Sequence, residues 1–250
     1  MSGISVVSVV LDREMYSRCV SGNDNFKGCR LVEFRNWEEN LPVTARYNSF
    51  LETVSPDDGW IVFCHEDWEA LEPVPDLLAR LSPDFIYGPI GVLLEEHPKA
   101  DVILSFGGLL QSAKCGRRVI RIKGYRPEGR VDTLDCQCII VHSSLVCRYG
   151  LRFDENLKFD MYAEDFCVTA YERFGIETRA TSIACHHHSG GKLSQAFFNS
   201  LAYVRNKFAD SRKRYATIVG HLNTFGRGEE RPVFKWKRTW VARLRYRLIR

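Results

Sequence analysis

Runs of apolar residues separated by polar segments predict alternating strands and helices in the first part of the chain. Ile4–Val10, residues 29–34 and Trp60–Cys64 are apolar runs of strand length. A polar stretch of about twenty residues after the first run is long enough for one helix. Before the third run, apolar residues from Val43 to Val54 fall on one helical face. This order predicts a parallel sheet with helices on both faces.

The pattern is less regular in the rest of the chain. Residues 91–130 are rich in Gly, Lys and Arg without clear periodicity, which predicts loops or an antiparallel excursion. The other expected elements are helices at 74–81, 162–174 and 193–208 and strands at 85–90, 138–142 and 176–184. A chain of 250 residues, 45% of them hydrophobic, is long enough for one large core.

Two clusters of acidic and imidazole side chains stand at element boundaries. His65, Glu66 and Asp67 directly follow the apolar run 60–64, and ligands of open α/β folds bind beyond the carboxyl ends of such strands. Glu164 and Asp165 lie near the start of a predicted helix, where the helix dipole favours ionised carboxylates. The first cluster also has a plainer interpretation as a solvated turn, and the second as a favourable partner of the helix dipole.

A third cluster is the run of three histidines that follows the strand expected at 176–184. If the backbone is extended there, His186 and His188 share one face and His187 points away. Imidazole together with carboxylate suits Mn²⁺, Mg²⁺ or Zn²⁺. A surface loop without a ligand is the alternative.

Two segments of the chain resemble the two halves of family 2-like glycosyltransferases with the GT-A fold. Residues 31–69 contain a Tyr-Asn pair and a strand that ends in a His-x-Asp variant of the Asp-x-Asp motif. Residues 131–191 contain Tyr-x-Glu-Asp and terminal histidines. The resemblance covers residues 4–191 except 91–130. It implies an α/β fold of the GT-A (Rossmann-like) type, with a mixed, mostly parallel sheet flanked by helices.

The same resemblance implies how the chain is divided. We expect a single glycosyltransferase domain at 1–210, with a nucleotide-binding half at about 1–90 and an acceptor half at about 131–210. Residues 211–250 would form a basic helical tail.

The resemblance also implies roles for the residues at the ends of the strands. Asp67 stands where the last, metal-binding acid of the Asp-x-Asp motif stands, and His65 replaces the first acid. Asp67 together with His186 or His188 would hold a divalent ion, Mn²⁺ or Mg²⁺. His65 and Glu66 would contact the nucleotide-sugar donor.

Further donor and acceptor contacts follow from the same match. Glu33 and Asn36, at the end of the second strand, would face the base and the ribose. Asp135 would face a sugar hydroxyl of the donor. Asp165 matches the catalytic base of inverting members, with Glu164 beside it orienting the base or the acceptor.

These roles predict an inverting transfer from a nucleotide-sugar, with UDP the favoured nucleotide, to a glycan or lipid-linked acceptor. The context would be the synthesis of a surface polysaccharide or lipopolysaccharide. A metal held by Asp67 and a histidine would stabilise the departing diphosphate, and Asp165 would take the proton of the attacking hydroxyl. Two other classes stay open: a metal-dependent hydrolase of a phosphorylated or nucleotide-sugar substrate, and a non-catalytic membrane-associated binding module.

The net charge of +4 is a property of the C-terminal residues. Residues 235–250 contain seven Lys or Arg and no acid, and the remainder has 28 basic against 31 acidic residues. Basic residues mixed with Trp and Tyr are typical of a helix on an anionic membrane, and a helix docked on the protein body is the alternative. A slightly acidic body argues against nucleic-acid binding.

The cysteines and the N-terminus bear on the location of the protein. Nine cysteines, mostly in apolar segments, indicate reduced buried thiols, and the first residues lack the basic segment of a signal peptide. We therefore expect a cytoplasmic protein, with peripheral association at the inner face of the plasma membrane through residues 235–250.

Overall fold

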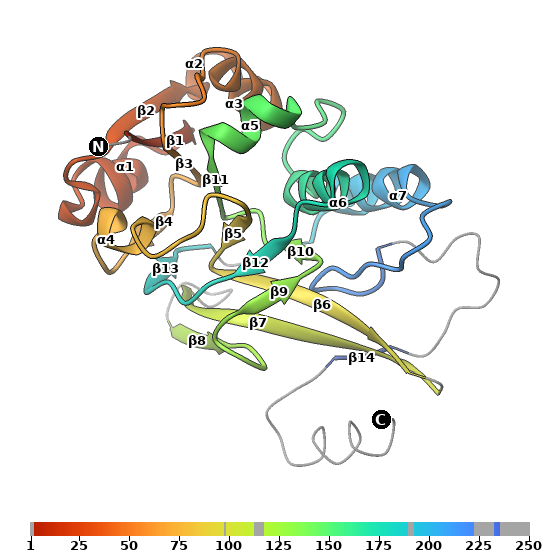
Figure 1. Cartoon of the computed structure of the whole chain (residues 1–250). Helices are drawn as coiled ribbons and strands as arrows, with labels where there is room; N and C mark the ends of the chain where they lie inside the picture. Colours follow the sequence, from red (N-terminus) through yellow and green to blue (C-terminus); the bar gives the residue numbers. More distant parts are fainter. Residues whose placement is uncertain (1–2, 98, 113–117, 190–192, 223–232, 236–250) are drawn as a thin grey trace.

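The computed structural model describes residues 3–97, 99–112, 118–189, 193–222 and 233–235. Its strands form two sheets, with helices packed around the first of them (Figure 1). The first sheet has the order β2-β1-β3-β11-β5-β12-β9. Its strands are β1 (Ile4–Val10), β2 (Arg30–Arg35), β3 (Trp60–Cys64), β5 (Ile86–Gly88), β9 (Gly129–Val131), β11 (Cys138–His142) and β12 (Thr178–Ala180).

The second sheet is built around the long strand β7 and has the order β10-β6-β7-β13-β4. Two further strands, β8 and β14, also pair with β7. The bounds are β4 (Trp68–Ala70), β6 (Ile90–Glu96), β7 (Asp101–Ser112), β8 (Val119–Lys123), β10 (Thr133–Leu134), β13 (Cys185–His187) and β14 (Val233–Lys235). Residues 91–130 are thus largely an antiparallel excursion, one of the two forms that we expected.

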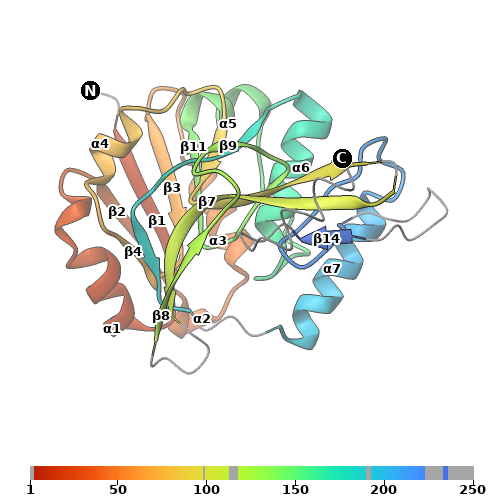
Figure 2. The same cartoon turned by 90° about the horizontal axis from the view of Figure 1, so that it is seen from below.

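Helices lie on both faces of the first sheet, as the order of elements predicts (Figure 2). Alternate residues of β1 face separate cores: Val7 and Val9 pack with α3, α5 and α6, and Val6 and Val10 with α1 and α4. The helices are α1 (Arg13–Tyr16), α2 (Asn36–Glu39), α3 (Val43–Leu51), α4 (Val74–Leu78), α5 (Ser143–Tyr149), α6 (Tyr162–Phe174) and α7 (Gln195–Lys207). A π-helix (Ser17–Ser21) and a 3₁₀-helix (Asp24–Phe26) follow α1.

The first sheet is parallel only in part. Strands β2, β1 and β3 are parallel, as expected, but β11 enters beside β3 in the antiparallel direction. Cys138 therefore pairs with Cys64, the last residue of β3. This register places the loop before β11, which contains Asp135, beside the carboxyl end of β3.

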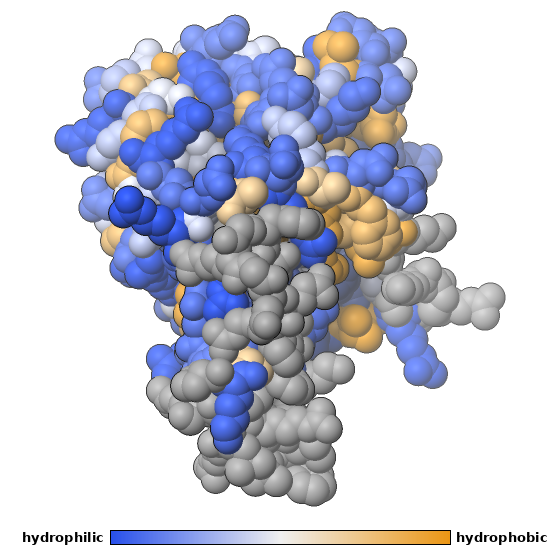
Figure 3. All heavy atoms as spheres, turned by 90° about the vertical axis from the view of Figure 1, so that its right-hand side faces the viewer, coloured by the Kyte–Doolittle hydropathy of each residue, from blue (hydrophilic) through white to orange (hydrophobic). Residues whose placement is uncertain are grey.

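Residues 211–222 depart from the expected helical tail, because their described structure is a folded segment without a helix. Tyr215, Ala216 and Leu222 are buried, and a bridge joins Ala216 to His221. Residues 236–250, on which the expected membrane-binding helix depends, lie outside the described residues. Within the described part, no helix has both the length and the apolar content required to cross a bilayer. Seen from the side of α7, the described surface is mostly hydrophilic, with apolar side chains gathered in places (Figure 3).

A buried ion cluster fixes residues 211–222 to the second sheet. Arg214 donates from Nη1 and Nη2 to the two oxygens of Asp101, at 2.6 and 3.1 Å. His221 Nε2 lies 2.9 Å from Asp101 Oδ2, and the Asp101 side chain is fully buried. Arg214 also pairs with the half-exposed Glu96 at 2.8 Å.

Replacing Asp101 by Asn is expected to lower the free energy of unfolding by about 3 kcal/mol, because a buried guanidinium loses its bidentate partner. Glu96→Gln is the matched control, because Glu96 is an exposed carboxylate that pairs with the same Arg214. We expect it to lower the free energy of unfolding by less than about 1 kcal/mol. Urea denaturation of both variants gives the comparison. Equal losses of unfolding free energy in the two variants would contradict the larger contribution that we assign to the buried Asp101.

Candidate active site and metal centre

The β3–β4 connection carries the predicted His-Glu-Asp cluster from the first sheet to the second. β3 ends at Cys64 and β4 begins at Trp68, so His65, Glu66 and Asp67 form the whole turn. β13 pairs antiparallel with β4, and His187 is opposite Trp68. The pairing brings the histidine run against a turn that lies more than a hundred residues earlier in the chain.

Three side chains at this junction have ligand atoms close enough to share one metal ion. The atoms come from His65, Asp67 and His187 and lie within 4.8 Å of one another. Asp67 Oδ1 is 3.3 Å from His187 Nε2 and 4.0 Å from His65 Nδ1. Asp67 Oδ1 and His187 Nε2 are buried and have no hydrogen-bond partner among the described residues. These two atoms form a close ion pair with each other but no well-aligned hydrogen bond, and a divalent cation fits this donor set.

The hydrogen bonds of His65 leave the correct nitrogen free for a metal. Tyr162 donates its single hydroxyl proton to the Cys136 carbonyl at 2.6 Å, so its oxygen accepts the proton of His65 Nε2 at 3.0 Å. His65 Nδ1 then has a lone pair on the side of Asp67. Burial, reinforced by His187, lowers the pKa of His65 to about 4, so the imidazole is neutral at neutral pH.

The attraction between Asp67 and His187 shifts their pKa values more than burial does. Burial would raise the pKa of Asp67 and lower that of His187, but their mutual attraction lowers the first and raises the second. This part of the site therefore already favours an anionic carboxylate.

The other two histidines belong to a second group, apart from Asp67, and their expected role as metal ligands stays a prediction. As the alternation predicts, these two share a face, with ring centroids 3.7 Å apart. Their partner is Glu69, whose Oε2 lies 3.6 Å from His186 Nδ1 and 2.7 Å from His188 Nε2. The reason is the two-residue period of strands, because β13 turns His187 alone toward Asp67. Glu69, His186 and His188 also have the spacing of a metal group.

The first turn of α6 places two more polar side chains at the junction. Met161, immediately before α6, has a left-handed backbone with φ 66°, and Tyr162 and Glu164 follow in the first turn. Glu164 is 8% exposed, and its Oε2 has no hydrogen-bond partner among the residues that the structure describes. Burial raises the pKa of Glu164 to about 8, and the charges of Asp135 and Asp160 add to the shift.

Asp165 points in a different direction from Glu164. Its carboxylate lies 2.7 Å from the Lys207 ammonium of α7, and the residue is only 1% exposed. Lys207 also holds Asp154 at 2.7 Å. Burial raises the pKa of Asp165, and Lys207 opposes that shift. Successive residues of a helix are about 100° apart, which explains why these two neighbouring carboxylates have different surroundings.

Asp135 lies between the metal-competent group and α6. Its charge acts on His65 and His187 on one side and on Glu164 on the other. Asp135 Oδ1 accepts from the Gln137 side-chain amide at 3.0 Å, which holds the carboxylate in this loop.

The remaining predicted site residues make local contacts. Glu66 accepts from the backbone N–H groups of Leu11 and Asp12, which fixes the end of β1. The side-chain amide of Asn36 is bonded to the backbone of Leu41 through both its oxygen and its nitrogen, at 2.9 Å each. Glu33 lies 3.6 Å from Arg35, at the exposed end of β2. Sequence reasoning placed all three toward the donor, and these contacts neither require nor test that role.

Two residues of the junction were not assigned in advance, His187 and Tyr162. The sequence contained a signal for the first, because three consecutive histidines on a strand must present one ring opposite to the other two. The assignment required the pairing of β13 with β4, which local pattern does not determine. Tyr162 stood next to the acidic pair without any feature that marked its hydroxyl.

The fold is similar to that of one solved glycosyltransferase structure, and two further solved structures match with lower TM-scores. GalNAc-T7, crystallised with UDP, GalNAc and Mn²⁺, matches with a TM-score of 0.51 and 8% identity, over 84% of this chain and 49% of that one. TarS of S. aureus matches with a TM-score of 0.48 and 13% identity, over 84% of this chain and 40% of that one. A197 from STIV matches with a TM-score of 0.43 and 12% identity, over 75% and 86%.

The chain thus spans about half the length of the GalNAc-T7 chain. No protein-family model and no curated protein matches it. At 8% identity the likeness defines the fold, and it confirms the expected class: a mixed α/β structure of the GT-A type, with two sheets and flanking helices.

Proposed function

We propose that the protein is a metal-dependent glycosyltransferase that moves a sugar from a nucleotide-sugar to an acceptor hydroxyl. The observation that carries the proposal is the convergence of His65, Asp67 and His187 at the carboxyl end of β3 in a GT-A-like fold. GalNAc-T7, which has a similar fold, was crystallised with UDP and Mn²⁺, and this supports a UDP-sugar and Mn²⁺ as donor and ion.

The chain's own residues suggest how such an ion would be held. His65 Nδ1, Asp67 Oδ1 and His187 Nε2 would be the ligands, and Tyr162 fixes the orientation and tautomer of His65. Bound there, a divalent ion would supply positive charge for the diphosphate leaving group. The buried, unpartnered atoms of Asp67 and His187 would then be satisfied.

Glu164 is the carboxylate that we propose as the general base. It lies close enough to Asp135 for that charge to raise its pKa, its Oε2 is free of hydrogen bonds within the described structure, and its raised pKa of about 8 lies close to neutral pH. Asp165, which the family resemblance favours as base, would instead hold α7 through Lys207. We retain direct displacement with inversion, in which Glu164 would act as the single base. Proton NMR of the anomeric centre of the product tests that stereochemistry.

The acceptor and the location complete the proposal. We retain a glycan or lipid-linked glycan as acceptor, in surface polysaccharide or lipopolysaccharide synthesis, and a cytoplasmic location. The basic and aromatic sequence 235–250 supports contact with an anionic membrane. Its deletion should then abolish co-sedimentation with anionic vesicles, and unchanged co-sedimentation would contradict the membrane contact.

A thermal-shift panel of UDP, GDP, CMP and dTDP, each with Mn²⁺ or with EDTA, tests the donor. We expect UDP to stabilise the protein only with Mn²⁺, by about 2.7 kcal/mol at a hundred times its dissociation constant. Equal stabilisation in EDTA would contradict the metal centre. No response to any nucleotide would contradict the transferase. Release of free sugar at the full rate without an acceptor would favour the hydrolase.

A further inference from the structure

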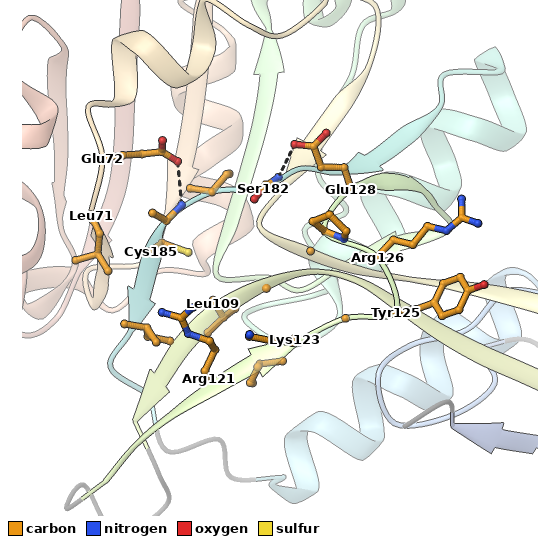
Figure 4. A pocket seen from close by; sticks show the side chains of 18 of the residues that line it. Leu71, Glu72, Leu109, Arg121, Lys123, Tyr125, Arg126, Glu128, Ser182 and Cys185 are labelled. Atoms are coloured by element: carbon orange, nitrogen blue, oxygen red, sulfur yellow. Dashed lines mark hydrogen bonds between the residues drawn. The ribbon is translucent and has the colours of Figure 1, made fainter. Parts of the chain in front are cut away.

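A cavity of about 770 Å³ lies between the end of β4, the loop before β13, and the ladder of β7 and β8 (Figure 4). None of the residues that line it belongs to the junction of His65, Asp67 and His187. Its volume lies in the range of small-molecule sites. The residues that β7 and β8 contribute to its lining belong to the segment 91–130.

Strand register places the cations of β8 on the opposite face of the second sheet from His187. Leu110 of β7 pairs with His186 on one side and with Arg121 on the other, so these three residues share a face. Lys123 follows Arg121 by two positions and shares that face as well. His187 projects to the other face, toward Asp67. Leu109, Ile122 and Cys185, which also line the cavity, lie at alternate positions and face the same side as His187, so the lining includes residues from both faces of the sheet.

The lining of the cavity has more positive than negative charge. Four of the lining residues are cationic (Arg80, Arg121, Lys123 and Arg126), and two are acidic (Glu72 and Glu128). Both acids accept from backbone N–H groups across the cavity wall, Glu72 from Ala184 at 2.9 Å and Glu128 from Ser182 at 3.3 Å (Figure 4).

Only one of the four cations is neutralised by a neighbouring carboxylate. Arg80 pairs with Glu72 at 3.2 Å, whereas Arg121 and Lys123 have no ion pair in the described part of the chain. The guanidinium of Arg126 lies over the ring of Tyr125, 5.4 Å from the ring centroid. The surrounding sequence, residues 113–130, has seven basic residues and one acid.

The floor of the cavity is formed by closely packed backbone. A Cβ at Gly108 would lie 2.7 Å from the Ile122 carbonyl, and one at Gly124 would lie 2.6 Å from that of Ser105. Gly107 has φ 81°, a conformation that favours glycine. Side chains are excluded from this floor, and the apolar residues Leu109, Leu110 and Ile122 also line the cavity.

We propose that this cavity binds a phosphate-bearing sugar. Arg121 and Lys123 would contact the phosphate, because unpaired guanidinium and ammonium groups are the usual ligands of that group. The apolar floor would pack against the sugar ring. The site does not depend on the proposed transfer reaction, and none of its lining residues belongs to the group of His65, Asp67 and His187.

Isothermal titration with glucose 1,6-bisphosphate, in EDTA, tests the site, with glucose as the neutral probe. We expect the wild-type protein to bind the bisphosphate and not glucose. Arg121→Gln combined with Lys123→Gln should weaken binding at least tenfold. Both side chains are exposed, so this double variant is expected to fold. Lys27→Gln combined with Arg148→Gln removes the same charge from exposed positions elsewhere and should change affinity less than twofold.

Three results would overturn the site. They are no binding of the bisphosphate, an equal loss in the Lys27 and Arg148 control, and a loss in Asp67→Asn, which would assign the ligand to the junction. Co-sedimentation with vesicles that contain phosphatidylinositol 4-phosphate distinguishes the source of the ligand. Sedimentation that requires Arg121 and Lys123 indicates a lipid headgroup. Its absence, with bisphosphate binding retained, indicates a soluble sugar phosphate.

Discussion

Replacing Glu164 by Gln is expected to lower kcat/KM for sugar transfer by about 10²- to 10⁴-fold, the usual contribution of a positioned base. Gln preserves the size of the side chain and cannot accept the proton. In the wild type, kcat/KM should rise with pH as Glu164, with its pKa of about 8, ionises. The variant's residual activity should lack this rise. A pH profile of both proteins makes the comparison.

The same substitution is expected to stabilise the protein. Burial raises the pKa of Glu164 from its ordinary 4.5 to about 8, so between these values the folded state binds a proton that the unfolded state lacks. The free energy of unfolding of the wild type therefore falls as pH rises through this window. Gln escapes that cost, and Glu164→Gln should gain on the order of 2 kcal/mol at pH 7 and nothing below the unfolded pKa. Urea denaturation at pH 4 and pH 7 measures the difference.

Asp165→Asn is the control for the choice of base. It removes one partner of Lys207, which keeps Asp154, and we expect a moderate loss of stability with transfer largely retained. The reverse outcome, with activity lost in Asp165→Asn and kept in Glu164→Gln, would restore the role that the family resemblance implies and exclude Glu164 as the base.

Asp67→Asn or His187→Gln is expected to abolish the Mn²⁺-dependent stabilisation by UDP. Changes outside the ligand set already weaken metal sites by about 10- to 100-fold, so the loss of one of three ligands should exceed that. Asp67 is the only carboxylate of the group, and His187 Nε2 is its nearest ligand atom. Direct Mn²⁺ titration by electron paramagnetic resonance, together with the nucleotide thermal shift, measures both effects.

His186→Gln and His188→Gln are matched controls, because they change neighbouring histidines that face Glu69 instead of Asp67. We expect both variants to keep the Mn²⁺-dependent response to UDP. If these variants lost the response and His187→Gln retained it, the Glu69 group would be the nucleotide-linked metal centre. The expectation from the sequence for His186 and His188 would then hold.

The elements that the sequence predicts well are those whose pattern is set by local burial. Trp60–Cys64 is uniformly apolar and Ile4–Val10 is largely apolar because helices cover both faces of their sheet. Tyr162–Phe174 has both helical spacing and a glycine at its C-terminal end, where φ is 69°. Short strands such as β4 and β13, three residues each, have no pattern long enough to recognise.

The same limit explains what could be predicted of the candidate site. Asp67 and Glu164 could be predicted as site candidates because they are acidic residues at the boundaries of predicted elements. The choice of His187 depended on the register between two short strands, and the different directions of Glu164 and Asp165 depended on where α7 packs. Both are tertiary facts, and local sequence does not contain them.

The pairing of β13 with β4 also sets when this centre can come into existence. His65 and Asp67 are separated from His187 by about 120 residues. A chain emerging from the ribosome therefore presents an incomplete ligand set until most of the protein has been synthesised. The nascent chain would not capture a divalent ion at this place. Once formed, an ion there would cross-link a very long loop, so chelators should speed unfolding as well as stop turnover.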